Sequence, residues 1–170
     1  RDVTGVQTCA LPIYKANWHL IHDIADLFPK LFDFCAYMDV AALKARVDAC
    51  QMWIFCIRHK NNIVAAYFIE DAMMLYEKVN DYGGKTLNLM ASVCNKKNYG
   101  LFVKGLNDCF YCIQKQNRDY TMLLVDDVGH NKILAKHMQA VPLIQTKGAY
   151  YMINGFVRES VDGDRAIMLI

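Results

Sequence analysis

A basic stretch containing one glycine stands at the start of a long segment with helical apolar periodicity. It reads Lys97-Asn98-Tyr99-Gly100-Leu101-Phe102, and Lys96 adds a second positive charge. The first turn of a helix presents unpaired backbone N–H groups and about half a positive charge, so it attracts anions such as phosphate. The stretch therefore has the composition of a phosphate-binding helix start. A flexible loop, in which the glycine only eases the turn, is the alternative.

Two other groups of residues have ligand-like spacing. Cys109 and Cys112 are separated by two residues, as in redox and metal motifs, but no second pair stands at zinc-site distance. His19 and His22 could bridge a metal at helical spacing, yet no further His or Cys has ligand-like spacing near them. We therefore interpret both groups as ordinary helix residues and expect no metal site.

Helices are predicted in the first third of the chain. Apolar residues recur every three or four positions from Trp18 to Cys35, which indicates an amphipathic helix that Pro29 kinks or divides. Asp39 is a predicted N-cap for a short second helix, whose apolar face ends at Cys50.

The pattern then changes to strands that alternate with helices. The polar residues His59–Asn62 predict a hairpin turn, and Val161–Asp164 predicts another near the C-terminus. Residues 86–93 alternate like a half-buried strand, whereas residues 120–125 are nearly all apolar, as in a strand covered on both faces. The predicted strands are Met52–Arg58, Ile63–Ile69, Thr86–Val93, Tyr120–Val125, Ala149–Arg158 and Arg165–Ile170. The predicted helices of this part are Tyr99–Gln116 and Asn131–Ala140.

This order of elements predicts a single α+β, or mixed α/β, domain with helices packed on a twisted sheet. The net charge of +2 gives no electrostatic footprint for nucleic acid or an anionic membrane. No apolar run approaches the ~20 residues that a spanning helix needs. Most cysteines lie inside apolar stretches, as buried thiols do in a reducing compartment, so we expect a cytoplasmic protein.

The first residues do not have a natural pattern. Back-translated, Val3 to Ile13 follow a standard sequencing adapter codon by codon, and Arg1 and Asp2 look like the index bases before it. We interpret residues 1–13 as adapter-derived and residues 14–170 as the natural domain. No chemistry is therefore assigned to a residue before Tyr14.

The order of elements resembles the GNAT superfamily of acyl-CoA-dependent N-acyltransferases. The resemblance covers most of residues 14–170 and rests mainly on topology, with Gly100 before the long helix as its main motif residue. It implies a mostly antiparallel sheet with helices on both faces. Family members begin with one more strand, so the resemblance implies that truncation has removed that strand here. It also implies acetyl-CoA as co-substrate, bound where Thr86–Val93 and Tyr120–Val125 splay apart.

The family's pyrophosphate motif reads Gln or Arg, two residues, Gly, one residue, then Gly or Ala. Lys97 stands at the first position and Gly100 at the central one, but Phe102 departs from the small residue at the last. The resemblance implies an oxyanion-stabilising backbone N–H between Ala91 and Val93. The other implied cofactor contacts are Lys97, Asn98, Tyr99, Gly100, Leu101 and Asn131, which opens the next helix.

The resemblance also implies an acid and a base. The Tyr that often protonates the departing thiolate falls on His137 or Met138, depending on a one-residue choice of register, and of these only His137 could donate a proton. The fourth strand lacks the family's Glu, so Glu70 and Asp71, at the end of the preceding strand, are the nearest candidate bases. A surface position is the alternative for each. Direct attack by the amine needs no base.

The implied function is acetyl transfer to a primary amine of a small molecule or protein, with no nucleic-acid or membrane partner and with a homodimer left open. A second hypothesis is a GNAT-like structural or interaction protein that binds no CoA, such as a diverged tailed-phage virion component. Phe102 in the loop and the absent Tyr favour it. A third is a small α+β binding module outside the family, whose parallel strands would not splay.

Overall fold

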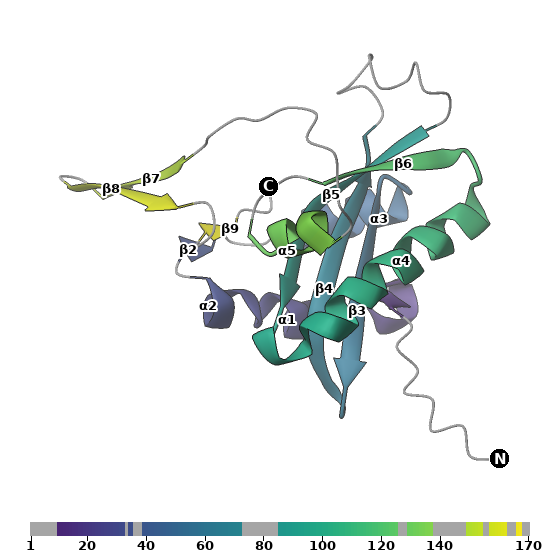
Figure 1. The fold of residues 1–170 in the computed structure, drawn as a ribbon, viewed down its shortest axis with the longest axis horizontal. Coiled ribbons are helices and arrows are strands. Elements are labelled where there is room, and N and C mark those ends of the chain that lie inside the picture. The colour runs from purple at the N-terminus through teal and green to yellow at the C-terminus, as the bar shows by residue number, and fades with distance from the viewer. Residues whose placement is uncertain are drawn as a thin grey trace.

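The chain is described from a computed structural model, whose described residues are 10–32, 34–35, 39–72, 85–125, 129–137, 149–154, 157–162 and 166–167. A five-stranded sheet with the order β1-β3-β4-β5-β6 forms the centre of this part of the chain (Figure 1). Its strands are β1 (Leu11–Pro12), β3 (Met52–His59), β4 (Asn62–Asp71), β5 (Lys85–Cys94) and β6 (Tyr120–Val125). Neighbouring strands pair antiparallel except β5 and β6, which are parallel.

Helices pack on both faces of this sheet, which confirms the mixed α/β prediction. One face carries α1 (Leu20–Ala25), α2 (Phe28–Leu31) and α3 (Val40–Asp48), and the other carries α4 (Tyr99–Gln116) and α5 (Asn131–His137). Successive strand residues point to opposite faces, so the core divides into two clusters. The first includes Ile21, Ile24, Phe28, Ile54 and Phe68. The second includes Phe55, Tyr67, Phe102, Leu106, Cys109 and Ile113.

The N-terminal helices partly follow the prediction. Pro29 divides the helical segment as expected, and it lies in the first turn of α2, where a missing N–H removes no helix hydrogen bond. The extension of the helix to Cys35 was wrong. The backbone is already extended at Phe32, and Cys35 belongs to the short strand β2 (Phe34–Cys35), which pairs in parallel with β9 (Ala166–Ile167).

For the next helix, α3, the predicted N-cap is confirmed, but the predicted C-terminal end is not. Asp39 accepts hydrogen bonds from the N–H groups of Ala41 and Ala42, each at 3.0 Å. Cys50 was predicted on the apolar face, which was wrong: it lies beyond α3, is exposed, and has a φ of 56°. The left-handed residue turns the chain into β3 directly after the helix.

The central strands occur where they were predicted, with different burial. Lys60 and Asn61 have φ values of 48° and 66°, as a two-residue hairpin turn requires. β5 is buried on both faces and not half-buried, because helices cover both sides of the inner strand. β6 is only partly covered and its Thr121 is exposed, because it is the edge strand of the sheet.

The helices of the second half agree with the sequence better than the last hairpin does. α4 has the predicted bounds, whereas Pro142 and the predicted end of the following helix lie outside the described residues. The hairpin predicted at Val161–Asp164 was wrong. β7 (Ala149–Asn154) pairs with β8 (Val157–Asp162), and Asn154 stands opposite Val157, so the chain reverses between them. Asn154-Gly155, a strong hairpin dipeptide, is the signal that the prediction passed over.

The edge beside β3 is occupied by residues that the sequence assigns to the adapter. Leu11 and Pro12 stand opposite Cys56 and Phe55, and the Ile13 N–H donates to the carbonyl of Ile54 at 2.8 Å. Only 1% of Ile13 is exposed. This segment therefore fills the position of the first strand that we expected to be lost. The adapter origin of residues 1–13 stays a prediction.

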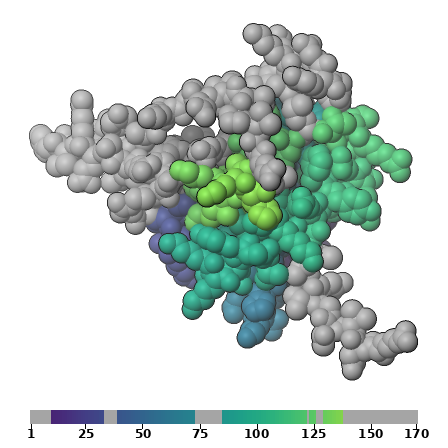
Figure 2. All heavy atoms as spheres, in the orientation of Figure 1, coloured from purple at the N-terminus to yellow at the C-terminus, as the bar shows by residue number. Residues whose placement is uncertain are grey.

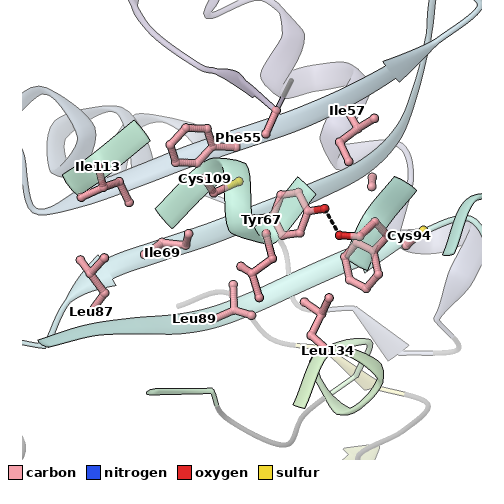
Figure 3. Close-up of a cluster of buried hydrophobic side chains, with 14 of the residues drawn as sticks. Phe55, Ile57, Tyr67, Ile69, Leu87, Leu89, Cys94, Cys109, Ile113 and Leu134 are labelled. Carbon is pink, nitrogen blue, oxygen red and sulfur yellow. Dashed lines mark hydrogen bonds between the residues drawn. The ribbon is translucent and has the colours of Figure 1, made fainter. Parts of the chain in front are cut away.

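Gly105 of α4 lies close against the sheet. Tyr67 stacks on Phe102 with ring centroids 5.3 Å apart and donates its hydroxyl hydrogen bond to the Phe102 carbonyl (Figure 3). A Cβ atom added at Gly105 would lie 2.5 Å from both the Tyr67 hydroxyl oxygen and Ile57 Cδ1. Only glycine therefore allows α4 this close to Tyr67.

Replacing Gly105 with alanine is expected to lower the free energy of unfolding by about 1–2 kcal/mol, because overpacking outweighs the gain in helix propensity. Gly100→Ala in the same helix is the control, since a Cβ there would meet nothing within 4 Å. Urea unfolding of the two variants measures the difference. Equal stability would show that the Tyr67 ring moves aside at no cost.

Candidate functional site

Among the described residues, the parallel strands β5 and β6 pair along the first half of β5. The register runs from Lys85 opposite Tyr120 to Leu89 opposite Val125, the last described residue of β6. β5 continues to Cys94 and stays paired with β4 on its other side. On the side that faces β6, the second half of β5 is therefore paired with no described residue of that strand, and we call this stretch the splayed edge.

Asn131, the first residue of α5, occupies the start of this splayed edge. Its side-chain Nδ2 donates to the carbonyl of Leu89 at 3.0 Å and lies 3.5 Å from that of Met90. Its Oδ1 accepts a hydrogen bond from the Ser92 hydroxyl. Asn131 and Ser92 are fully buried. One side-chain amide thus bonds both the backbone and a side chain of this edge.

His130 occupies the far end of the same edge. Its Nδ1 accepts the backbone N–H of Cys94 at 2.9 Å. The ring lies 4.9 Å from the Phe32 ring and 6.3 Å from the Tyr99 ring, between centroids. Burial lowers the pKa of His130, and the charge of Lys96 lowers it further. His130 is therefore a neutral imidazole with its proton on Nε2.

The loop between β5 and α4 satisfies part of its own backbone. Asn95 accepts the N–H of Lys97 on its side-chain oxygen at 3.2 Å, and the N–H of Asn98 on its backbone carbonyl at 2.8 Å. No side chain caps α4, and the space beside Gly100 is open. The Phe102 side chain is buried in the core and does not fill that space. α5 lies directly against α4 on this surface (Figure 2).

Ala91 and Val93, the residues predicted on β5, differ from Ser92 between them in the direction of their backbone groups. The side chains of Ala91 and Val93 are buried in the first core cluster, and these residues stand opposite Phe68 and Ala66 of β4. Backbone groups alternate along a strand, and the Cys94 N–H points away from β4 towards His130. By the same alternation, Ser92 is the residue of this stretch whose N–H faces the splayed edge.

Of the two predicted catalytic side chains, Glu70 lies away from the splayed edge, and no described contact joins His137 to it. Glu70 stands opposite Asn88, in the paired half of β5, and its carboxylate is ion-paired with Arg46 and accepts from Asn88 Nδ2 at 3.2 Å. The other candidate base, Asp71, accepts the Tyr120 hydroxyl at 2.6 Å. His137 is exposed at the end of α5.

The structure therefore brings together some of the predicted residues and not others. Asn131 contacts the splayed edge, and the loop that carries Lys97 and Gly100 follows directly from its end. Sequence reasoning did not identify His130 as a candidate. The signal was an imidazole directly before the helix-opening Asn131, but its partner Cys94 is distant in the chain.

Neither a metal site nor a membrane span is found in the described parts of the chain. These residues contain no group of three or more His, Cys, Asp or Glu side chains placed to hold a metal ion. No helix among them has the length and apolar character to cross a bilayer. Cys109 is a buried free thiol whose pKa is raised by burial, which fits the interpretation of Cys109 and Cys112 as packing residues.

Comparisons with known proteins bear on the fold. No protein-family model matches the sequence, and a search of curated proteins finds no significant match. Several solved structures are similar. An aminoglycoside acetyltransferase from an uncultured soil metagenomic sample superposes with a TM-score of 0.60 and 10% identity, over 85% of this chain and 94% of that one.

Two further structures give the same result. A ribosomal-protein-alanine N-acetyltransferase from Brucella melitensis has a TM-score of 0.55 and 15% identity, over 85% of this chain and 97% of that one. An aminoglycoside 6'-N-acetyltransferase from Acinetobacter baumannii has a TM-score of 0.56 and 16% identity, over 87% and 98%. The chain therefore has the fold of the GNAT acetyltransferases, as the order of its elements predicted.

Proposed function

We propose that this protein is an acyl-CoA-dependent N-acyltransferase that transfers an acetyl group from acetyl-CoA to a primary amine of a small molecule or a protein. The observation that carries the proposal is the end of the described β5–β6 pairing at Leu89, next to a helix start without a side-chain cap, within a fold shared with acetyltransferases. Buried free thiols fit a reducing compartment such as the cytoplasm.

In this proposal the cofactor lies along the splayed edge of β5. Its pyrophosphate is held by the first turn of α4, with Lys97 and Lys96 supplying positive charge and Gly100 leaving room for the phosphates. Asn98, Tyr99 and Leu101 belong to the same loop and first turn. The pantetheine arm follows the splayed half of β5 past Asn131. The thioester oxygen accepts a backbone N–H between Ala91 and Val93, for which Ser92 is the residue with the fitting direction.

The chemical step is attack of the neutral amine nitrogen on the thioester carbonyl carbon. The carbon–sulfur bond breaks, the amide nitrogen loses a proton to solvent, and the sulfur leaves as a thiolate that takes up a proton. His137 is the proposed proton donor, because its imidazole is exposed and histidine is the side chain that most often acts as a general acid. Holding amine and thioester together supplies most of the acceleration.

Glu70 is not required as a base in this scheme. To take a proton, its carboxylate would have to give up the ion pair with Arg46 or the hydrogen bond from Asn88. Glu70→Gln is therefore expected to reduce kcat less than threefold and the free energy of unfolding by about 1 kcal/mol. Steady-state kinetics and thermal unfolding measure both effects. Arg46→Gln is the matched control, because it removes the same ion pair and leaves the carboxylate. A hundredfold loss of kcat in Glu70→Gln alone would identify Glu70 as the base.

A second candidate function is a GNAT-like structural or interaction protein without CoA, such as a phage virion component. The observation that favours it is the filled splay, in which Asn131 and His130 already bond the carbonyl of Leu89 and the N–H of Cys94. These are backbone groups beside which a pantetheine arm would have to lie.

Calorimetry with acetyl-CoA on the full chain separates the two functions. Micromolar binding, followed by CoA release in the presence of a panel of primary amines, supports acyl transfer. If a folded sample binds nothing at millimolar acetyl-CoA, acyl transfer is overturned and the non-catalytic function stands.

A further inference from the structure

The far end of the splayed edge is closed by a side chain of the protein itself. The Cys94 N–H, at the last residue of β5, would face a ligand if its acceptor were absent, but His130 Nδ1 accepts it at 2.9 Å. The next residue, Asn95, begins the loop that leads into α4. The imidazole therefore stands between the splayed strand and the helix start to which the proposed cofactor phosphates would bind.

The His130 ring also joins the two faces of the sheet. Phe32 follows α2 on the first face, and Tyr99 opens α4 on the second. The imidazole lies 4.9 Å from the first ring and 6.3 Å from the second, between centroids. A flat side chain placed between two aromatic rings from opposite faces would obstruct an arm that runs along this edge of β5.

The backbone of His130 is held by α5. The His130 carbonyl accepts the N–H of Ile133 at 3.1 Å, and Asn131, immediately after, is anchored by its buried bonds to Leu89 and Ser92. Gly129, directly before, has a φ of 54°, a left-handed conformation that glycine adopts without strain. Because the backbone is held, the imidazole would leave the Cys94 N–H by rotating about its own side-chain bonds while α5 keeps its place.

We propose that His130 is an autoinhibitory latch on the proposed acyl-CoA cleft: its neutral ring closes the cleft by accepting the Cys94 N–H, and the pantetheine arm enters only when the ring rotates away about its own side-chain bonds. This inference rests on the proposed function. Removing the His130 ring should strengthen binding of the cofactor, whereas removing a residue that binds the cofactor would weaken it.

Protonation opens the same latch. An imidazolium has no lone pair at Nδ1 and cannot accept the Cys94 N–H. Around the ring, burial raises the pKa of the Tyr99 hydroxyl and raises that of the Cys94 thiol to about 12, so both stay neutral. The charge of Lys96 also acts on the ring, and Phe32 carries no charge. Asp126 and Asp127, which precede the turn, lie outside the described residues.

His130 is therefore the group in this surrounding that changes charge in mild acid. Since its pKa in the folded protein is lowered, the neutral closed form prevails at pH 7. Its contribution to stability is present above about pH 6.5, the ordinary imidazole value, and is lost as the pH falls through the lower folded value.

Two substitutions test the latch by calorimetry with CoA at pH 8 and pH 5.5. His130→Ala removes ring and acceptor, so its Kd should be about tenfold lower than that of the wild type at pH 8. His130→Gln keeps an acceptor that cannot be protonated, so it should bind like the wild type at pH 8 and gain less than the wild type at pH 5.5. Any titration of CoA itself is common to all three proteins and cancels in this comparison.

Amide hydrogen exchange gives a second readout that needs no cofactor. Exchange of the Cys94 amide should accelerate at least tenfold in His130→Ala, whereas the Asn95 amide, which donates to the Val64 carbonyl at 2.9 Å, should not change. Weaker CoA binding by His130→Ala, or a Cys94 amide that exchanges as before, overturns the latch and leaves the proposed function standing. Absence of CoA binding by all three folded proteins overturns the proposed function, and the latch with it.

Discussion

Replacing Gly100 with aspartate is expected to weaken acetyl-CoA binding about 100-fold while leaving the fold at least as stable. The carboxylate would stand in the first turn of α4, next to the phosphates of the proposed cofactor. Two like charges about 4 Å apart repel by up to about 4 kcal/mol at the surface of a protein, so a loss of this size is within reach of a single charge. Calorimetry at low ionic strength measures the change in Kd.

Stability should change in the opposite direction from affinity. A Cβ at Gly100 meets nothing within 4 Å, so the larger side chain causes no clash. A negative charge in the first helical turn favours the helix by about 0.3–1 kcal/mol, and replacing glycine adds helix propensity. Thermal unfolding of Gly100→Asp should therefore show an unchanged or higher Tm. Loss of binding together with loss of folding would make the variant uninformative about the phosphates and contradict this expectation.

Gly100→Ala separates charge from shape. It adds a Cβ in the same open space but no charge, so acetyl-CoA binding should stay within about threefold of the wild type. If alanine and aspartate weaken binding equally, the requirement at this position is for a bare backbone and not for the absence of negative charge. If neither weakens binding, the phosphates do not lie at the start of α4.

The elements that sequence predicted well are those whose signal is local. The bounds of α4 follow from apolar spacing within the helix itself, and the Asp39 cap from one side chain and the next three residues. The predictions that failed concern distant partners. Cys35 leaves a helical pattern because β2 pairs with β9, which lies near the other end of the chain. Local periodicity contains no information about such a partner.

The same division applies to the site. Gly100 and Asn131 were predicted because their positions at helix starts can be read along the chain. His130 was not, because its role is a hydrogen bond to Cys94 and two ring contacts that arise only after folding. Likewise, Glu70 has the residue type of a base, but Arg46, 24 residues earlier, engages it. Residue type gave candidates, and the folded surroundings decide how each is engaged.

The shared fold leaves the activity to these few contacts. At 10–16% identity, the acetyltransferase structures establish how the strands are arranged and not what binds between them. In this chain the space beside Gly100, at the start of α4, is open. The splayed edge of β5 is instead occupied by the side chains of His130 and Asn131. Whether the protein binds CoA therefore depends on whether these side chains can move. Asn131 is fully buried and held by two partners, whereas His130 is the side chain that we propose to move.

Asn131→Ala is expected to lower the free energy of unfolding by about 2–4 kcal/mol. The amide is fully buried, and its loss leaves the Leu89 carbonyl and the Ser92 hydroxyl without the partner that satisfies them. An unsatisfied buried polar group costs about 1–3 kcal/mol, and two groups are affected here. Urea unfolding measures the loss, with the slope of the transition checked for a change in the unfolded state.

Two further variants divide this loss between the two partners. Ser92→Ala removes the hydroxyl that donates to Asn131 and should cost about 1 kcal/mol. The double variant Asn131→Ala with Ser92→Ala should then lose less than the sum of the single losses, because the hydroxyl is no longer left alone. Simple additivity would mean that the bond between the two side chains contributes little. In that case Asn131 would not be the fixed anchor beside which the His130 ring is proposed to rotate, and α5 would have to move together with the ring.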